Sequence, residues 1–192
     1  MRGFSANAKI FLLGNAVAFF GMAMYGLLFN LYLKESGHSE GQIGSILSFT
    51  ALGAAVAAFP SALLLENLPT KLILAGAAIM TSVFYGLQGL WRGDEMLMIG
   101  AFFSGAFLSI YTTSIPSFFM RNSSVEQRMH LFSAHASSMM LAQLLGHFAG
   151  GMLPGLFMRM APELDFASAY KTTLFVGSGI LLVSTLAFTK IQ

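Results

Sequence analysis

Residues 10–33 read IFLLGNAVAFFGMAMYGLLFNLYL, a run that contains no Asp, Glu, Lys or Arg. A helix rises about 1.5 Å per residue, so a helix of this length spans the roughly 30 Å hydrocarbon core of a bilayer. Backbone groups inside lipid must be satisfied within their own segment, which favours a helix over a strand. The run is also longer than the apolar region of a signal peptide. It therefore predicts a transmembrane helix.

Five further stretches of the chain are equally free of charged residues and long enough to cross a bilayer. They are residues 41–65, 72–91, 96–120, 129–158 and 172–189. The breaks between them are too short to hold a soluble domain. The sequence therefore predicts an all-α integral membrane protein, with residues 1–192 forming a single domain of six transmembrane helices.

The composition excludes several classes of protein. Of the 192 residues, 56% are hydrophobic and 9% are charged, where a soluble domain carries about 25% charged residues. The lack of any basic run argues against binding to nucleic acid. The chain has no cysteine, which excludes disulfides, Cys-ligated metals and thiol nucleophiles. We expect the lipid bilayer as the surroundings of this chain, and no cofactor.

The charged residues between the spans predict the orientation, because cytoplasmic loops carry an excess of Lys and Arg. One side of the membrane receives six basic residues, which are Arg2, Lys9, Lys71, Arg121, Arg128 and Lys190. The other side receives four, which are Lys34, Arg92, Arg159 and Lys171. We therefore expect both termini to lie in the cytoplasm. The membrane that the chain crosses is expected to be the plasma membrane of a bacterium.

Two sequence stretches suggest an internal repeat, and three others suggest a family. Residues 34–42, KESGHSEGQ, follow the first span much as residues 121–127, RNSSVEQ, follow the fourth, as in a 3+3 inverted repeat. In addition, residues 39–48 read SEGQIGSILS, residues 66–71 read ENLPTK, and residues 116–128, PSFFMRNSSVEQR, lead into GHFAGG at 146–151. These last stretches resemble the entry to helix 2, the loop after helix 2, and the helix 4–5 connection with its glycine-rich helix 5 in the Major Facilitator Superfamily.

The resemblance implies one six-helix half of a secondary active transporter that moves a small solute by alternating access. Family members usually have two such halves, so the pore would be completed by a second copy in a homodimer or by a partner half. A cavity lining rich in Met and Phe favours an amphipathic or weakly polar solute. The chain departs from the family in the loop of residues 66–71, where the family pattern is G-x-x-x-D-[RK]-x-G-[RK]-[RK]. Of this pattern the chain keeps only an acidic residue, Glu66, and the last basic residue, Lys71.

In that family, helices 1, 2, 4 and 5 of this half line the cavity or its gates. Polar residues within these helices are therefore candidates for contact with the solute. The candidates for the substrate cavity are Asn15, Tyr25, Asn30, Thr112, Thr113, Gln143 and His147. Buried amides in a membrane helix need partners, so the asparagines should face protein or cavity. Hydrogen bonding and close packing between helices are the competing interpretation for all of these residues.

Histidines and loop charges supply the candidates for coupling and gating. His135 and His147 are candidate proton switches, because imidazole changes its charge near neutral pH and no span contains Asp or Glu. The spacing of the histidines in this region does not predict a metal site, since helical ligand pairs lie at i, i+4. Loop residues that could close a cytoplasmic gate by ion pairing are Glu66, Lys71, Arg121, Glu126 and Arg128. Gly146, Gly150 and Gly151 are expected to allow close helix contact.

Two other functions compete with transport. An intramembrane protease of the rhomboid type needs Gly-x-Ser-Gly, and the closest stretch, residues 176–179, VGSG, places the first glycine one position late. The chain also lacks the G-x-x-x-x-G-K-[ST] loop of ATP-driven proteins, so we do not expect an enzyme. The alternative that stays open is an isolated or truncated half, without transport, that has a structural or assembly role.

Overall fold

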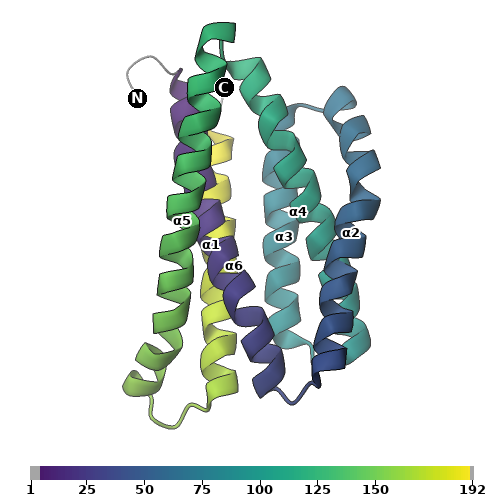
Figure 1. The fold of residues 1–192 in the computed structure, drawn as a ribbon, viewed down its shortest axis with the longest axis vertical. Coiled ribbons are helices and arrows are strands. Elements are labelled where there is room, and N and C mark those ends of the chain that lie inside the picture. The colour runs from purple at the N-terminus through teal and green to yellow at the C-terminus, as the bar shows by residue number, and fades with distance from the viewer. Residues whose placement is uncertain (1–4, 191–192) are drawn as a thin grey trace.

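The computed structural model describes residues 5–190 and consists of six long helices (Figure 1). They are α1 (Ala6–Glu35), α2 (Glu40–Asn67), α3 (Thr70–Leu90), α4 (Asp94–Asn122), α5 (Val125–Met160) and α6 (Phe166–Thr189). All six are long and apolar enough to cross a membrane, which confirms the predicted all-α membrane fold. Arg2, which was used to predict the orientation, lies outside the described residues.

Both chain termini lie at the same end of the bundle, which we call the terminal end (Figure 1). The opposite end, which holds the α1–α2, α3–α4 and α5–α6 connections, is called the distal end. Capping residues explain several helix boundaries. Ser39 forms a capping box with Gln42 at the start of α2, and Asp165 accepts a hydrogen bond from the backbone N–H of Ser168 at the start of α6. Gly37 makes the turn before α2 with φ of 90°.

The helices form two triplets with the same internal contacts. In one triplet α1 contacts α5 and α6, and in the other α4 contacts α2 and α3. Exchanging helices 1–3 with helices 4–6 turns one set of contacts into the other, and the contact between α3 and α6 joins the triplets. Because α1 begins at the terminal end and α4 at the distal end, the two triplets run in opposite directions. This arrangement is a 3+3 inverted repeat.

Glycines allow the backbones to approach within each triplet. A β-carbon on Gly53 of α2 would collide with the backbone carbonyl of Phe102 in α4, and one on Gly105 of α4 would collide with the carbonyl of Thr50. In the other triplet, Gly21 of α1 faces α6, where a β-carbon would lie 2.6 Å from the carbonyl oxygen of Gly177. These positions admit no larger side chain without a shift of the backbone.

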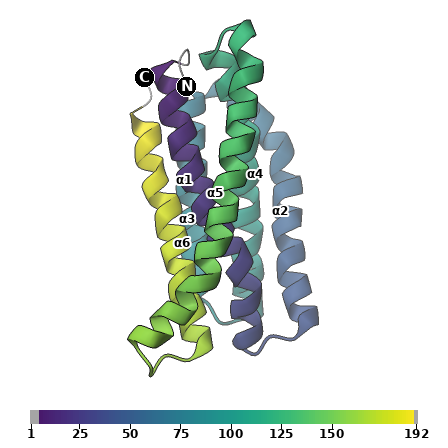
Figure 2. The same ribbon diagram turned by 60° about the vertical axis from the view of Figure 1, so that its left-hand side comes forward.

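The helices differ strongly in how far they are covered. Within the most apolar stretch of each helix, 61% of the residues of α1 are buried, against 22% in both α2 and α5. In Figure 1, α5, α1, α4 and α2 lie across the near side of the bundle, with α6 behind α1 and α3 behind α4. Figure 2 shows α5 crossing in front of α1. The helix α1 is therefore the centre of the packing, and α2 and α5 present broad exposed faces.

Candidate functional site

Three polar side chains from three helices meet inside the terminal half of the bundle. The hydroxyl of Tyr111 on α4 donates to the amide oxygen of Asn15 on α1 at 2.6 Å. The amide nitrogen of Asn15 lies 3.0 Å from Nδ1 of His135 on α5. Two of these residues, Asn15 and His135, were predicted separately, and the structure brings them together. We call Asn15, Tyr111 and His135 the polar cluster.

The polar cluster is surrounded by aromatic rings. The ring of His135 lies edge-on to Phe19 at 6.2 Å and to Phe119 at 5.2 Å between ring centroids. Asn15 and Tyr111 are both fully buried, and His135 is half-buried. Fully buried polar groups such as those of Asn15 and Tyr111 depend on protein partners for their hydrogen bonds.

The amide of Asn15 fixes the direction of both hydrogen bonds. A side-chain amide has one acceptor oxygen and one donor nitrogen. Since Tyr111 donates to the oxygen, the nitrogen is left to donate to Nδ1 of His135. That bond requires an imidazole without a proton on Nδ1. In the reversed amide orientation, His135 would donate to the oxygen and Tyr111 would accept.

Sequence reasoning missed Tyr111, which lies directly before the candidates Thr112 and Thr113. A signal was available. Tyrosines in membrane helices gather near the interface, whereas Tyr111 lies well inside a span, where its hydroxyl needs a partner. Thr112 and Thr113 are both exposed, and the hydroxyl of Thr112 donates to the carbonyl of Leu108 in its own helix at 3.0 Å.

The remaining cavity candidates do not join the polar cluster. Tyr25 is buried between α1 and α3, where its ring stacks on that of Tyr85 with centroids 3.6 Å apart and planes 2° apart. Its hydroxyl is the only buried tyrosine oxygen within residues 5–190 that has no hydrogen-bond partner. Asn30 on α1 and His147 on α5 are exposed, and Gln143 is half-buried.

The predicted gate residues lie at the terminal end, and two of the arginines contact helix carbonyls. Arg121 donates to the carbonyl of Leu65, near the end of α2, at 3.0 Å. Arg128 donates to the carbonyl of Met120, near the end of α4, at 3.2 Å. The last carbonyls of a helix have no partner in the helix and carry partial negative charge, so they suit a guanidinium. Glu66, Lys71 and Glu126 are exposed at the same end.

The three glycines singled out on α5 have different surroundings. Gly146 faces α1, where a β-carbon would meet the carbonyl of Phe20, and Gly150 lies against Met24. A β-carbon on Gly151 would meet nothing within 4 Å, and the same holds for Gly155, four residues further on. The helix α5 thus has one glycine pair against α1 and a second pair that is open.

A second hydrogen-bonded group, which the sequence did not indicate, ties the connections at the distal end. Asp94, in the first turn of α4, accepts a hydrogen bond from Gln42 of α2 at 2.6 Å. The same carboxylate lies 3.3 Å from Nε2 of His38 in the α1–α2 turn. These side chains therefore hold the α1–α2 turn and the start of α2 against the start of α4 at the distal end.

Comparison with known proteins bears on these features. No curated protein matches the chain. The profile of the Major Facilitator Superfamily matches residues 11–191, a range that contains nearly all of the six helices. The six long apolar helices, arranged as two inverted triplets, are consistent with one six-helix half of such a protein. The chain belongs to the Major Facilitator Superfamily.

Proposed function

We propose that this chain is one half of a secondary active transporter, which carries a small amphipathic or weakly polar solute by alternating access. Membership of the superfamily makes the protein a membrane transporter and not an enzyme. The proposal adds the kind of solute, a second six-helix half that completes the pore, and an orientation with the terminal end in the cytoplasm of a bacterium.

The observation that carries the proposal is the composition of the exposed face. Asn30, Thr112 and His147 are exposed on α1, α4 and α5. Polar groups facing lipid at this depth are costly, so a water-filled cavity or a second protein surface accounts for them better. Large apolar side chains such as Phe148 and Met140 are also exposed on α5, by 67% and 66%. A lining of this kind suits a solute with a large apolar part.

The second half is proposed to be another copy of this chain, and α5 offers the surface for it. The open pair Gly151 and Gly155 has the i, i+4 spacing that lets membrane helices approach closely. Beside it lies an apolar groove of about 420 Å³, lined by Ala149, Met152, Leu153, Gly155, Leu156 and Arg159. A second helix packed into this groove would cover Met152 and Leu156, which are 59% and 50% exposed.

Within this proposal, His135 of the polar cluster is the residue that responds to protons. A proton on Nδ1 would place two donors, that of the imidazole and that of the Asn15 amide, against each other. The amide must then turn over, which makes Tyr111 the acceptor of its bond, or the cluster must open. Either change alters the link between α1, α4 and α5, the helices that carry the exposed polar residues.

The molar mass of the detergent-solubilised chain tests the proposed second copy. After subtraction of detergent, light scattering is expected to give twice the monomer mass of 20.6 kDa. A particle of 20.6 kDa in mild detergent and in nanodiscs would contradict completion by a second copy. It would favour the alternative of an isolated half with a structural role.

A further inference from the structure

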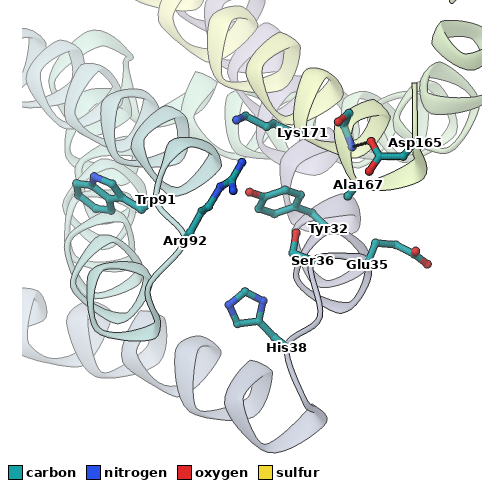
Figure 3. Close-up of a pocket in the computed structure, with 10 residues that line it drawn as sticks. Tyr32, Glu35, Ser36, His38, Trp91, Arg92, Asp165, Ala167 and Lys171 are labelled. Carbon is teal, nitrogen blue, oxygen red and sulfur yellow. Dashed lines mark hydrogen bonds between the residues drawn. The ribbon is translucent and has the colours of Figure 1, made fainter. Parts of the chain in front are cut away.

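A pocket opens at the distal end, on the side of the bundle formed by α1, α3 and α6 (Figure 3). It has a volume of about 350 Å³ and lies between the end of α1, the residues that follow α3 and the first turns of α6. The polar cluster is in the other half of the bundle, so this pocket is separate from it. The side chains that matter for its chemistry are Tyr32, Glu35, Trp91, Arg92, Asp165 and Lys171.

Two cationic side chains share the pocket. Arg92 and Lys171 extend from different elements towards the space beside Tyr32 (Figure 3). Within residues 5–190, neither forms an ion pair, and the described contact of Lys171 is with the ring of Phe175 at 5.9 Å. By contrast Lys34, a lysine at the same end, lies 3.9 Å from Glu40. The pocket therefore concentrates positive charge that the fold does not neutralise by pairing.

Neither acidic residue of the pocket forms an ion pair with Arg92 or Lys171 within residues 5–190. The carboxylate of Glu35 points away from Arg92 and Lys171 (Figure 3). Asp165 caps α6 by accepting the backbone N–H of Ser168 at 3.1 Å, and these hydrogen bonds lower the pKa of its carboxyl below the usual value. A lowered pKa keeps this carboxylate ionised, so the pocket wall also carries a negative charge at the start of α6, while Arg92 and Lys171 form no ion pair with it.

The pocket lies at the depth where lipid headgroups meet the protein. Trp91 and Tyr32 lie at helix ends, where amphipathic rings mark the membrane interface. Next to them, Leu90 at the end of α3 is 57% exposed, and Phe166 at the start of α6 is 55% exposed. A ligand with a phosphate at the interface and acyl chains along these apolar side chains would match both parts of the surface.

We propose that Arg92 and Lys171 bind the phosphodiester of a phospholipid headgroup in this pocket. Arginine offers a planar fork of donors to a phosphate, and lysine adds a compact point charge. The pair therefore suits a phosphate better than an uncharged, apolar ligand. The site tethers α1, α3 and α6 at the distal end to a single lipid. It does not depend on the identity of the transported solute or on the second half.

The test compares lipid binding by the complete chain and its variants. Native mass spectrometry of the delipidated protein, titrated with dioleoylphosphatidylglycerol, measures the bound fraction. The double variant Arg92→Gln and Lys171→Gln is expected to lose about tenfold or more in affinity, and each single change less. Lys34→Gln is the matched control, because it removes a charge at the same end outside the pocket. Unchanged helicity and elution volume establish that the variants are folded.

Two further probes separate the possible sources of the phosphate. Dioleoylglycerol has the same chains without phosphate and is expected to bind equally weakly to the wild type and the double variant. Phospholipid binding that excess inorganic phosphate does not displace assigns the site to the headgroup. Binding of inorganic phosphate alone, if lost in the double variant, assigns the same residues to free phosphate. Equal phospholipid binding by the wild type and the double variant, or an equal loss in Lys34→Gln, would overturn the proposal.

Discussion

Tyr111 donates a hydrogen bond of 2.6 Å to Asn15, a residue 96 positions earlier in the chain and in the other helix triplet. The helices α1 and α4, each of which contacts both other helices of its triplet, have few other contacts with each other. His135 extends the bond to α5, so three helices that carry exposed polar residues are joined at one buried point. A change in the hydrogen bonds of this cluster therefore affects both triplets.

The hydrogen bond of Tyr111 should contribute measurably to stability. Tyr111→Phe leaves the amide oxygen of Asn15 without its donor, and we expect a loss of about 0.5–1.5 kcal/mol. Tyr25→Phe is the matched control, because the hydroxyl of Tyr25 is equally buried but has no partner in residues 5–190. That change should be neutral or stabilising. Reversible unfolding in mixed micelles measures both variants, and equal losses would show that the bond has no net value.

His135 should make the stability of the protein depend on pH. The hydrogen bond from Asn15 needs an unprotonated Nδ1, so its contribution is present at neutral pH and is lost on the acid side. We expect the melting temperature to fall between about pH 7 and about pH 5, where imidazole ordinarily takes up a proton. In His135→Gln this fall should be reduced, while His147→Gln, at an exposed position, should keep it. A fall that persists in His135→Gln would assign it to other groups.

The crossing of α2 and α4 should not tolerate a methyl group. A β-carbon at Gly105 collides with the carbonyl of Thr50, so Gly105→Ala is expected to cost about 1–3 kcal/mol or to lower the folded yield. Gly44→Ala in α2 is the control, since a β-carbon there meets nothing within 4 Å. Thermal unfolding in detergent compares them. If Gly105→Ala were as stable as Gly44→Ala, the helices would not be in close contact at this point.

The open glycine pair on α5 should matter for assembly and not for the fold of one half. Gly155→Leu fills the groove beside Met152 and Leu156, and is expected to shift the protein towards the monomer without lowering the melting temperature of that monomer. Gly179→Leu on α6 is the control, because a β-carbon on Gly179 also meets nothing within 4 Å and Gly179 does not line the groove. Light scattering as a function of protein concentration measures the shift. An equal shift in both variants would remove the proposed role of this groove.

The fold could be predicted from the sequence because it depends on the length and spacing of apolar runs. The run of residues 10–33 alone contains the whole argument for a span, and its helix extends only to Ala6 and Glu35. The similarity of residues 34–42 to residues 121–127 suggested the inverted repeat. Neither the apolar runs nor the repeat predicts which helices pair within a triplet. That pairing depends on which glycines lie against the backbone of another helix.

The polar cluster could be predicted only in pieces. Asn15 and His135 were each notable as polar residues in a span, but periodicity within one helix does not indicate which residue of another helix will meet them. Tyr111 was not selected, although Tyr25 was, because nothing within residues 96–120 indicates which other helix its hydroxyl will meet. The arginines at the terminal end were expected to form ion pairs, whereas Arg121 and Arg128 donate to carbonyls at helix ends, which no side-chain pattern encodes.

The central claim is that Thr112 and His147 line a cavity that contains water. The chain has no cysteine, so single substitutions can be labelled without a background. Thr112→Cys and His147→Cys in proteoliposomes should react with a membrane-impermeant maleimide. The control is Met80→Cys. Met80 is 38% exposed and lies in the middle of α3, on the far side of the bundle. A cysteine there should remain unlabelled in lipid. If the substitutions at 112 and 147 were as unreactive as that at 80, these residues would face lipid, and the proposed cavity would be contradicted.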